Sequence, residues 1–405
     1  MSAGAGAPPV VADAGAARRT TRLALVAGMA SLLDSAAIVS VGSALPLWRS
    51  HLGLDDWSVG LVSSSMTLSI AAGALLGGRL ADRLGRRRVF SATVGLYAVG
   101  AAWVAAAQTL EQLVAGVVVL GAASGADLPA SIALVAERTP AEVRGRMVAL
   151  THVLWTVGIV TATAMAVVAS PAGLAGARAA FVVLALGALG TLVARRRAVL
   201  AAPRSERLDS GPAPPAAGGR SGLSRRLLLI AAFYVVYTLV ANTFGSFRTY
   251  FLVVEGGATQ TGATVISFAV TLLGLAGTVV FSAIADTRWR RRVYPAAGAL
   301  LVGAQVLVAA SGAGSLGLVV AALVAYSLAY PYAGEGLYKV WAQESVRPDL
   351  RATFQGATIA AARAAAALFA LVTPSLMSWS PAGLFWVLAA CAATAMAIGA
   401  LVQRR

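Results

Sequence analysis

The stretch GGRLADRLGRRRVF, residues 77–90, decides the fold, because a related stretch recurs much later in the chain. The second copy reads FSAIADTRWRRRVY and occupies residues 281–294, an offset of 204 residues. Each copy ends a long apolar run and places an Ala-Asp pair before a cluster of arginines. A repeat at this distance indicates that the chain contains two related halves.

A second marker recurs at nearly the same offset. Glu137 precedes Arg144 by seven residues, and Glu344 precedes Arg351 by seven residues, 207 residues further on. Two independent markers at nearly one offset argue against a chance repeat. Tandem halves joined by a linker are an architecture of membrane transporters, in which one half rocks against the other.

The composition excludes a water-soluble domain. The 405 residues are 59% hydrophobic and only 12% charged, whereas soluble domains carry about 25% charged residues. Cys391 is the one cysteine, and His51 and His152 are the two histidines, so a disulfide within the chain and a Cys- or His-rich metal site are excluded. The phosphate-binding pattern Gly-x4-Gly-Lys-Ser/Thr is also absent. We therefore expect no metal, no cofactor and no enzymatic activity.

Long apolar runs recur along the chain, and each can cross about 30 Å of hydrocarbon. They predict an all-α membrane protein with twelve transmembrane helices in two pseudo-symmetric six-helix halves. The expected domains are a disordered tail (1–20), an N-terminal half (21–195), a linker (196–225) and a C-terminal half (226–405). The expected spans are 23–47, 57–78, 89–108, 112–136, 147–169, 175–194, 226–253, 260–284, 293–311, 315–339, 353–377 and 382–402.

The distribution of arginine predicts the orientation. The net charge is +16, and 27 of the 32 basic residues fall in the two tails and in the loops on the same side of the expected spans. By the positive-inside rule these segments are cytoplasmic, so both termini face the cytoplasm of a multi-pass inner (plasma) membrane protein. The basic excess thus needs no nucleic acid. We expect a lipid bilayer as the surroundings and a monomer as the working unit.

Several of these motifs resemble the major facilitator superfamily, in its sugar-porter-like group of metabolite and sugar:proton symporters. The loop motif Gly78-x-Leu-Ala-Asp-Arg-x-Gly-Arg-Arg, residues 78–87, resembles the family's motif between helices 2 and 3. The pattern Val-x-Gly-Ala-x2-Gly-x8-Leu-x2-Glu-x6-Arg, residues 119–144, is similar to the sugar-porter signature on helix 4. Gly28-x5-Asp34 and the segment 338–344 are similar to its first and tenth helices. The resemblance covers residues from about 20 to 402.

The resemblance implies a set of charged gating residues at the cytoplasmic helix ends. In the family, the aspartate of the loop motif holds the halves together in one conformation, and charge pairs that form in only one state bias a two-state equilibrium. The alternative is that the arginines serve only as positive-inside anchors. The expected gating residues are Gly78, Asp82, Gly85, Arg86, Glu137, Arg144, Asp286, Arg290, Glu344 and Arg351.

Three acidic residues inside the expected spans are candidates for proton coupling: Asp34, Asp127 and Glu335. Charged groups in the bilayer are costly and face a cavity or a partner. Asp34 is the leading candidate, although Val117 stands where proton-coupled relatives carry an arginine, which leaves a structural hydrogen bond as the alternative. Asp127 is alternatively a gating or packing residue.

The candidate substrate-binding residues lie on helices 5, 7, 10 and 11, and their hydroxyl, amide, aromatic and guanidinium groups suit a polar solute. Tyr326 and Tyr330 are one helical turn apart, and Tyr338 falls on roughly the same face. Tyr338 and Trp341 are alternatively an interfacial aromatic belt. Arg363 either pairs with Glu335 or binds an anionic substrate. The full set is Trp155, Tyr237, Asn242, Tyr326, Tyr330 and Arg363.

These observations predict a secondary active transporter that imports a small polar solute, such as a sugar, a polyol or a sugar acid, together with protons by alternating access. A proton-driven exporter of drugs or metabolites on the same fold is the alternative. That class usually carries a Gly-rich, Pro-containing motif on helix 5, whereas residues 150–169 contain one glycine and no proline.

Overall fold

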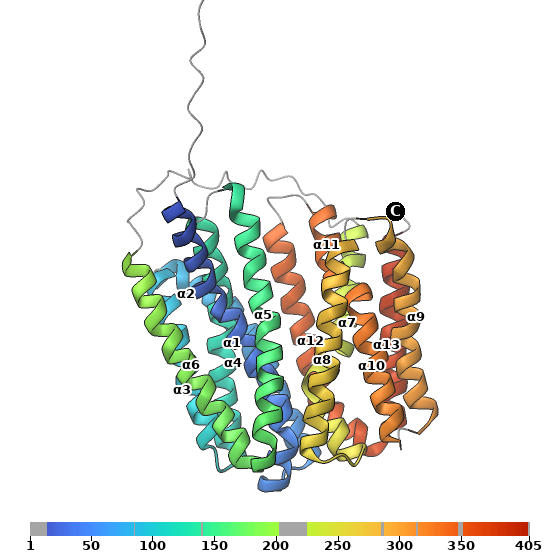
Figure 1. Cartoon of the computed structure of the whole chain (residues 1–405). Coiled ribbons are helices and arrows are strands. Elements are labelled where there is room, and N and C mark those ends of the chain that lie inside the picture. Colours follow the sequence, from blue (N-terminus) through green and yellow to red (C-terminus); the bar gives the residue numbers. More distant parts are fainter. Residues whose placement is uncertain are drawn as a thin grey trace, which may run out of the picture.

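The computed structural model describes residues 14–84, 86–138, 141–201, 225–284, 287–312, 315–346 and 351–403. These residues form long helices that are rich in Ala, Leu and Val. The N-terminal half comprises α1 (Ala14–Leu52), α2 (Asp56–Leu84), α3 (Arg86–Ala106), α4 (Leu110–Arg138), α5 (Ala141–Ala169) and α6 (Gly173–Ala201), with a 3₁₀ turn η1 (Ser170–Ala172) between the last two. All six run roughly along one direction in Figure 1.

The C-terminal half comprises α7 (Arg225–Tyr250), α8 (Gln260–Ile284), α9 (Trp289–Ala310), α10 (Leu316–Ala333), α11 (Glu335–Ser345), α12 (Arg351–Trp379) and α13 (Pro381–Gln403). A π-helical turn η2 (Phe251–Glu255) extends α7. Because α10 and α11 together fill the tenth expected span, the twelve expected spans all correspond to helices in the described part of the chain. The all-α, two-half architecture is thereby confirmed.

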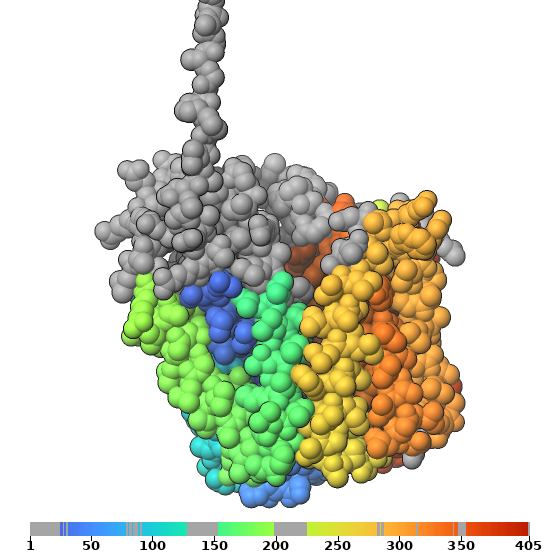
Figure 2. All heavy atoms as spheres, in the orientation of Figure 1, coloured from blue at the N-terminus to red at the C-terminus, as the bar shows by residue number. Residues whose placement is uncertain are grey.

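The two halves meet along pairs of helices that a two-fold relation exchanges. Helix α1 packs against α7, α2 packs against α12, and α5 packs against α8. The last two contacts are equivalent, since the second helix of each half meets the fifth helix of the other. Figures 1 and 2 show the N-terminal half in blue to green and the C-terminal half in yellow to red, side by side.

The helix bundle has two ends, which differ in the chain segments that they gather. The termini end is where α1 begins and α13 ends, and the distal end is where α1 ends at Leu52 and α7 ends at Tyr250. Among the described residues, ten segments are long and apolar enough to cross a membrane, one of them the 45-residue segment Val153–Arg197 that includes most of α5 and α6. Apolar side chains such as Val183, Leu186 and Leu368 remain exposed on the outer faces, as expected where lipid is the solvent.

Two expected boundaries differ from the structure. Helix α1 already begins at Ala14, so residues 14–20 are helical and not a disordered tail. Helix α6 continues to Ala201, six residues beyond the expected domain limit of 195, because the basic run 195–197 is compatible with a helix that emerges from the membrane. Residues 202–224 of the expected linker lie outside the described residues.

The tenth expected span is a broken helix. Helix α10 ends at Ala333 and α11 begins at Glu335, with Gly334 between them in a non-helical conformation. Pro331 lies one turn before the break and removes a backbone donor. A Cβ atom on residue 334 would collide with the hydroxyl of Tyr237 and lie 2.5 Å from the carbonyl oxygen of Tyr330. Glycine therefore allows the chain to pass close to α7 at this point.

Candidate functional site

Asp34 is buried in the N-terminal half and only half satisfied. It lies on α1 and is 1% exposed. Its Oδ1 accepts a hydrogen bond of 2.7 Å from the hydroxyl of Ser124 on α4, while its Oδ2 is buried with no hydrogen-bond partner among the described residues. Val117, the α4 residue at the position of the family arginine, is fully buried and brings no charge. A carboxyl group with one free oxygen has a site at which a proton can be carried.

Asp127, the second candidate, occupies a very different environment. Both of its carboxylate oxygens accept hydrogen bonds from the Arg195 guanidinium, Oδ1 at 2.6 Å and Oδ2 at 2.7 Å. The hydroxyl of Thr93 on α3 donates a third bond to Oδ1, at 2.9 Å. This bidentate pair stabilises the ionised carboxylate, so the packing role that the sequence left open fits Asp127 better than proton exchange.

The sequence pattern did not indicate Arg195 as a site residue, because the expected span 175–194 ends one residue before it. It lies near the end of α6 and is fully buried. The pair thus joins α4 to α6, and Thr93 adds α3. Asp127 itself could have indicated this pair. An acidic residue within a membrane span needs a cationic partner at the same depth, and the basic run at 195–197 contains such residues.

Glu335 opens α11, immediately after the break. Its Oε1 lies 2.8 Å from the ammonium nitrogen of Lys339 one turn later, and the two side chains are 40% and 39% exposed. Among the described residues Glu335 does not form the ion pair with Arg363 that the sequence allowed. Arg363, on α12, is half-buried. The other role expected of Arg363, binding of an anionic substrate, stays a prediction.

The predicted tyrosine pair on α10 is present and faces α7. The rings of Tyr326 and Tyr330 stack with centroids 5.8 Å apart, and Phe244 of α7 stacks on Tyr326 at 4.6 Å. Tyr237 of α7 reaches the same region, because its hydroxyl and the carbonyl oxygen of Tyr330 both lie within 2.5 Å of the position that a Cβ atom on Gly334 would take. We call these four side chains, Tyr237, Phe244, Tyr326 and Tyr330, the aromatic wall.

The other aromatic residues of this region do not continue that wall. Tyr338 lies beyond the break and stacks on Tyr234 at 3.9 Å. Trp341 packs edge-on against Phe233, with centroids 5.0 Å apart. Tyr338 and Trp341 are 1% and 2% exposed, so the interpretation as an interfacial belt was wrong. The bend at Gly334 explains the change of face.

Two further substrate candidates lie on opposite halves. Asn242 of α7 is half-buried, and its amide has no hydrogen-bond partner among the described residues. Trp155 of α5 is half-buried, and its backbone carbonyl accepts a 2.6 Å hydrogen bond from the hydroxyl of Ser35 on α1. Ser35 is the residue after Asp34, so α5 packs directly beside the buried carboxyl group.

One predicted gating pair is visible at the termini end. Arg290 of α9 and Glu344 of α11 form a bidentate ion pair, with Nη1–Oε1 at 2.8 Å and Nη2–Oε2 at 3.3 Å. The arginine side chain is 12% exposed and the carboxylate 44% exposed. The other gating predictions fall on residues outside those whose side chains the structure describes: Gly78, Asp82, Gly85, Arg86, Glu137, Arg144, Asp286 and Arg351.

The sequence did not predict the contacts that close the distal end. The amide of Gln260, at the start of α8, donates a 2.8 Å hydrogen bond to the backbone carbonyl of Ser43 on α1. Ser170 and Thr261 share a hydrogen bond of 3.1 Å across the same boundary. Gly42 faces the backbone of Ser246 so closely that a Cβ atom would lie 2.5 Å from the Ser246 oxygen.

A charged cluster completes this distal seal. Arg49, at the end of α1, forms a 2.9 Å ion pair with Asp56 at the start of α2. The Arg49 guanidinium also donates a hydrogen bond to the hydroxyl of Tyr250 on α7, and that hydroxyl lies 3.4 Å from Asp56. The N-terminal ion pair is thus tied to the C-terminal half. Backbone contacts and a cluster of this kind leave no compositional pattern, which is why the sequence did not indicate them.

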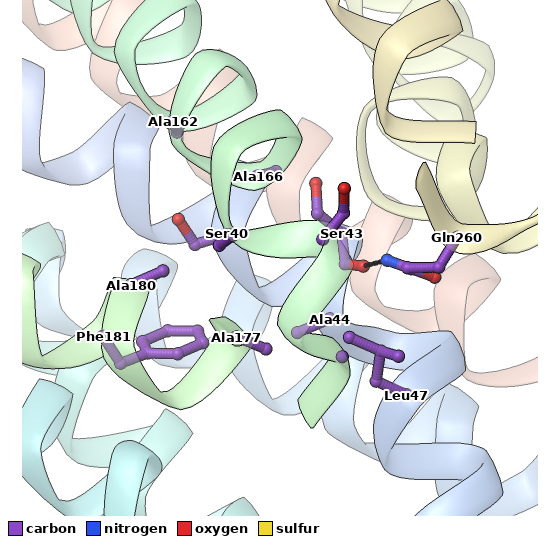
Figure 3. Close-up of a pocket in the computed structure, with 13 residues that line it drawn as sticks. Ser40, Ser43, Ala44, Leu47, Ala162, Ala166, Ala177, Ala180, Phe181 and Gln260 are labelled. Carbon is purple, nitrogen blue, oxygen red and sulfur yellow. Dashed lines mark hydrogen bonds between the residues drawn. The ribbon is translucent and has the colours of Figure 1, made fainter. Parts of the chain in front are cut away.

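A small cavity lies directly behind the Gln260–Ser43 bond. It measures about 30 Å³ and is lined by six alanines together with other residues that include Ser40, Phe181 and Gln260. Figure 3 shows Gln260 reaching toward Ser43 at one side of this space, and Phe181 at another. The hydroxyl oxygen of Ser40 and Oε1 of Gln260 are buried with no hydrogen-bond partner among the described residues. The volume suits water and is far too small for a sugar.

Two known proteins are similar in sequence to most of the chain. The chain is 28% identical to the minor myo-inositol transporter IolF of Bacillus subtilis (strain 168) over 396 residues, which is 93% of this chain and 89% of that protein. It is 26% identical to the 3-(3-hydroxy-phenyl)propionate transporter of Escherichia coli (strain K12) over 360 residues, or 85% and 84% of the two chains.

The same fold occurs in a crystal structure of a D-xylose-proton symporter, with a TM-score of 0.79 at 17% identity, over 93% of this chain and 96% of the other. The Major Facilitator Superfamily profile matches residues 24–370. Together with the two six-helix halves, this match shows that the chain is a multi-pass membrane protein and belongs to the Major Facilitator Superfamily of transporters.

Proposed function

We propose that the protein imports a small polar solute, a sugar, a polyol or a sugar acid, together with protons. It works as a monomer in the plasma membrane with both termini in the cytoplasm, as the arginine distribution favours. The distal end then faces outward. One relative supports the solute class, because it is named for transport of the polyol myo-inositol. A second relative is named for transport of an aromatic acid, and the structural neighbour is named as a proton symporter.

The observation that carries proton coupling is the half-satisfied carboxyl group of Asp34. It is buried, accepts one hydrogen bond from Ser124, and keeps one oxygen without a partner among the described residues. Because Arg195 holds Asp127 in a bidentate pair, Asp34 is the better carrier within the N-terminal half. A proton taken up at Asp34 removes a buried charge and so changes the energy of the conformation around α1 and α4.

Alternating access follows from the distal seal. In the observed conformation α1 contacts α7 at the outer end through Gly42, Ser246 and the Arg49–Tyr250 bond. Opening the outside requires these contacts to break. At the cytoplasmic end, the Arg290–Glu344 pair joins α9 to α11 in this same conformation, and we assign it to the charges that change partners during the cycle. The exporter alternative has no observation in its favour.

Uptake by purified protein in proteoliposomes tests the proposal. The probes are labelled myo-inositol, D-xylose, glucuronate and 3-(3-hydroxyphenyl)propionate, each offered with and without an inward proton gradient. We expect at least one probe to accumulate only when the gradient is imposed. In Asp34→Asn this accumulation is lost while exchange of internal for external probe continues, because the solute site remains intact. Glu111→Gln, an exposed carboxylate at the start of α4, is the matched control and accumulates normally.

Two results would overturn this assignment. Gradient-driven accumulation in Asp34→Asn equal to that of the control would remove Asp34 from the coupling step. If the unmodified protein exported every probe and imported none, the proposal that it is an importer would be refuted.

A further inference from the structure

Arg248 is a cation inside the C-terminal half for which the described residues provide no carboxylate. It lies in the last turn of α7, within a membrane-spanning segment, and is half-buried. Its Nη2 donates one hydrogen bond of 3.1 Å, to the hydroxyl of Thr271 on α8. A guanidinium has five N–H donors, so most of its hydrogen-bonding capacity is unused within the described part of the chain.

The unused donors are not sealed inside protein. Arg178 and Arg226 each have a guanidinium nitrogen that is buried without a partner among the described residues. Arg248 has no nitrogen of this kind. Its remaining donors therefore reach accessible space. A charged group in a membrane helix is expensive unless it meets a partner or a water-filled cavity. An arginine whose hydrogen-bond partner within the described residues is one threonine hydroxyl has a geometry suited to an anion that arrives from outside the chain.

The aromatic wall lies beside this guanidinium. Tyr237, Phe244 and Arg248 follow one another at i, i+7 and i+11, which places them on one face of α7. Phe244, one turn before Arg248, stacks on Tyr326 of α10, and Thr271, which holds the guanidinium, is one turn before Gly274, which faces Tyr330. Stacked rings next to a guanidinium offer an apolar surface for the body of a small molecule and a charged group for its acidic end.

Helix α8 packs closely against the wall. Gly274 faces Tyr330, and a Cβ atom at residue 274 would lie 2.6 Å from Cε1 of that ring. Thr271, the partner of Arg248, is one turn before Gly274 on the same helix. Thus α8 contributes a positioning hydroxyl for the guanidinium and a small residue against which the Tyr330 ring packs, on neighbouring turns of one helix.

We propose that the transported solute carries a carboxylate, and that Arg248 binds it while Tyr326 and Tyr330 contact the rest of the molecule. This inference rests on the proposed transport function and narrows its substrate class from polar solutes in general to organic acids. A monocarboxylate taken up with one proton moves no net charge across the membrane.

Binding to purified protein in detergent tests this inference without any proton gradient. The probes form pairs that differ in the acidic group: glucuronate against glucose, and 3-(3-hydroxyphenyl)propionate against its primary amide. We expect at least one acid to raise the unfolding temperature and its neutral partner to have no effect. The pair that responds distinguishes a sugar acid from an aromatic acid.

The variants separate a binding role from a structural one. In Arg248→Gln the dissociation constant for the responding acid rises about 10- to 150-fold, the range for losing a hydrogen bond to a charged group. Arg248→Lys retains part of the affinity because the charge remains. Since Arg248 has no described carboxylate partner, Arg248→Gln without ligand unfolds at the same temperature as the unmodified protein or higher. Arg291→Gln, on the exposed start of α9, is the control and binds normally.

The inference is overturned if neutral probes stabilise the protein as well as the acids do, if no acid stabilises it, or if Arg248→Gln binds the responding acid like the control. A drop in the unfolding temperature of ligand-free Arg248→Gln also contradicts it, because that result marks a structural arginine. Proton-driven uptake of a neutral solute would leave the proposed function standing while removing this inference. Uptake that does not depend on the proton gradient, with acid binding retained, would remove the proposed proton coupling while leaving this inference standing.

Discussion

Gly42 is the position at which the smallest chemical change has the largest expected effect on the transport cycle. A Cβ atom there would lie 2.5 Å from the backbone oxygen of Ser246 in the other half, and 3.2 and 3.3 Å from its C and Cα atoms. Ordinary contacts begin at 3.4 Å, so Gly42→Ala requires α1 and α7 to separate by about 1 Å at the distal end. Both partners are helix backbone and cannot rotate away.

The magnitude follows from the cost of overpacking. Forcing one extra methyl group into a closed contact costs about 1–3 kcal/mol, and here the cost applies only when the distal end is closed. The ratio of distally open to distally closed protein therefore rises about 5- to 150-fold. The population of the conformation with open distal contacts therefore increases relative to that in the unmodified protein.

Distances between spin labels measure this shift. Cys391 is first replaced by serine, and labels are attached at Ser50→Cys and Ser378→Cys, two exposed positions at the distal ends of α1 and α12. We expect Gly42→Ala to transfer population from the short to the long distance. Gly245→Ala is the matched control, because residue 245 precedes Ser246 on α7 and a Cβ atom there meets nothing within 4 Å.

Both variants gain the same helix propensity from alanine, so that effect cancels in the comparison. Identical distance distributions for Gly42→Ala and Gly245→Ala would refute the reasoning, because they would show that the close backbone contact does not limit distal closure.

Three further predictions concern other contacts. Arg195→Met should destabilise the protein by about 3–5 kcal/mol, because it leaves the Asp127 carboxylate without its bidentate partner, and adding Asp127→Leu should recover most of that loss. Thermal unfolding in detergent measures the stability of both variants. Equal instability of the single and the double variant would contradict the pairing. Arg290→Glu and Glu344→Arg should each slow uptake, and the variant that carries both exchanges should regain it. Initial uptake rates in proteoliposomes measure these effects. A double variant slower than either single variant would contradict a gating role for this ion pair. Tyr250→Phe removes the hydroxyl that joins the two halves at the distal end. Losing this hydrogen bond costs about 1 kcal/mol, so we expect about a fivefold shift toward the distally open state. The same spin-label pair measures the shift, and an unchanged distance distribution would exclude a role for this hydroxyl in closure.

The overall fold was predictable because it depends on quantities that a sequence states directly. Span length, apolar content and the asymmetry of arginine determine how a chain crosses a bilayer, and the repeat of residues 77–90 at 281–294 shows the two halves. The break at Gly334 was not predictable in the same way. Membrane helices tolerate proline and glycine, so Pro331 and Gly334 alone do not distinguish a bend from an interruption.

The candidate site was predictable only in part. Tyr326 and Tyr330 are one turn apart on a single helix, and local spacing places them together. The pairing of Asp127 with Arg195 joins residues 68 positions apart, and it depends on the depth at which α6 leaves the membrane, which apolar content alone placed several residues too early. The distal seal depends on the close approach of two helix backbones at Gly42. Because every residue has the same backbone atoms, the sequence does not indicate which residue of α7 lies opposite Gly42.

The buried pair between Asp127 and Arg195 also has a consequence for how the protein is made. Helix α4 leaves the ribosome before α6, so Asp127 enters the membrane before the guanidinium that neutralises it has been synthesised. Until α6 arrives, α4 carries a charge that membrane helices accommodate poorly. A nascent chain that stops before residue 195 thus presents an incomplete bundle to quality control, whereas one that continues through Ala201 can assemble its first half before any of α7 is translated.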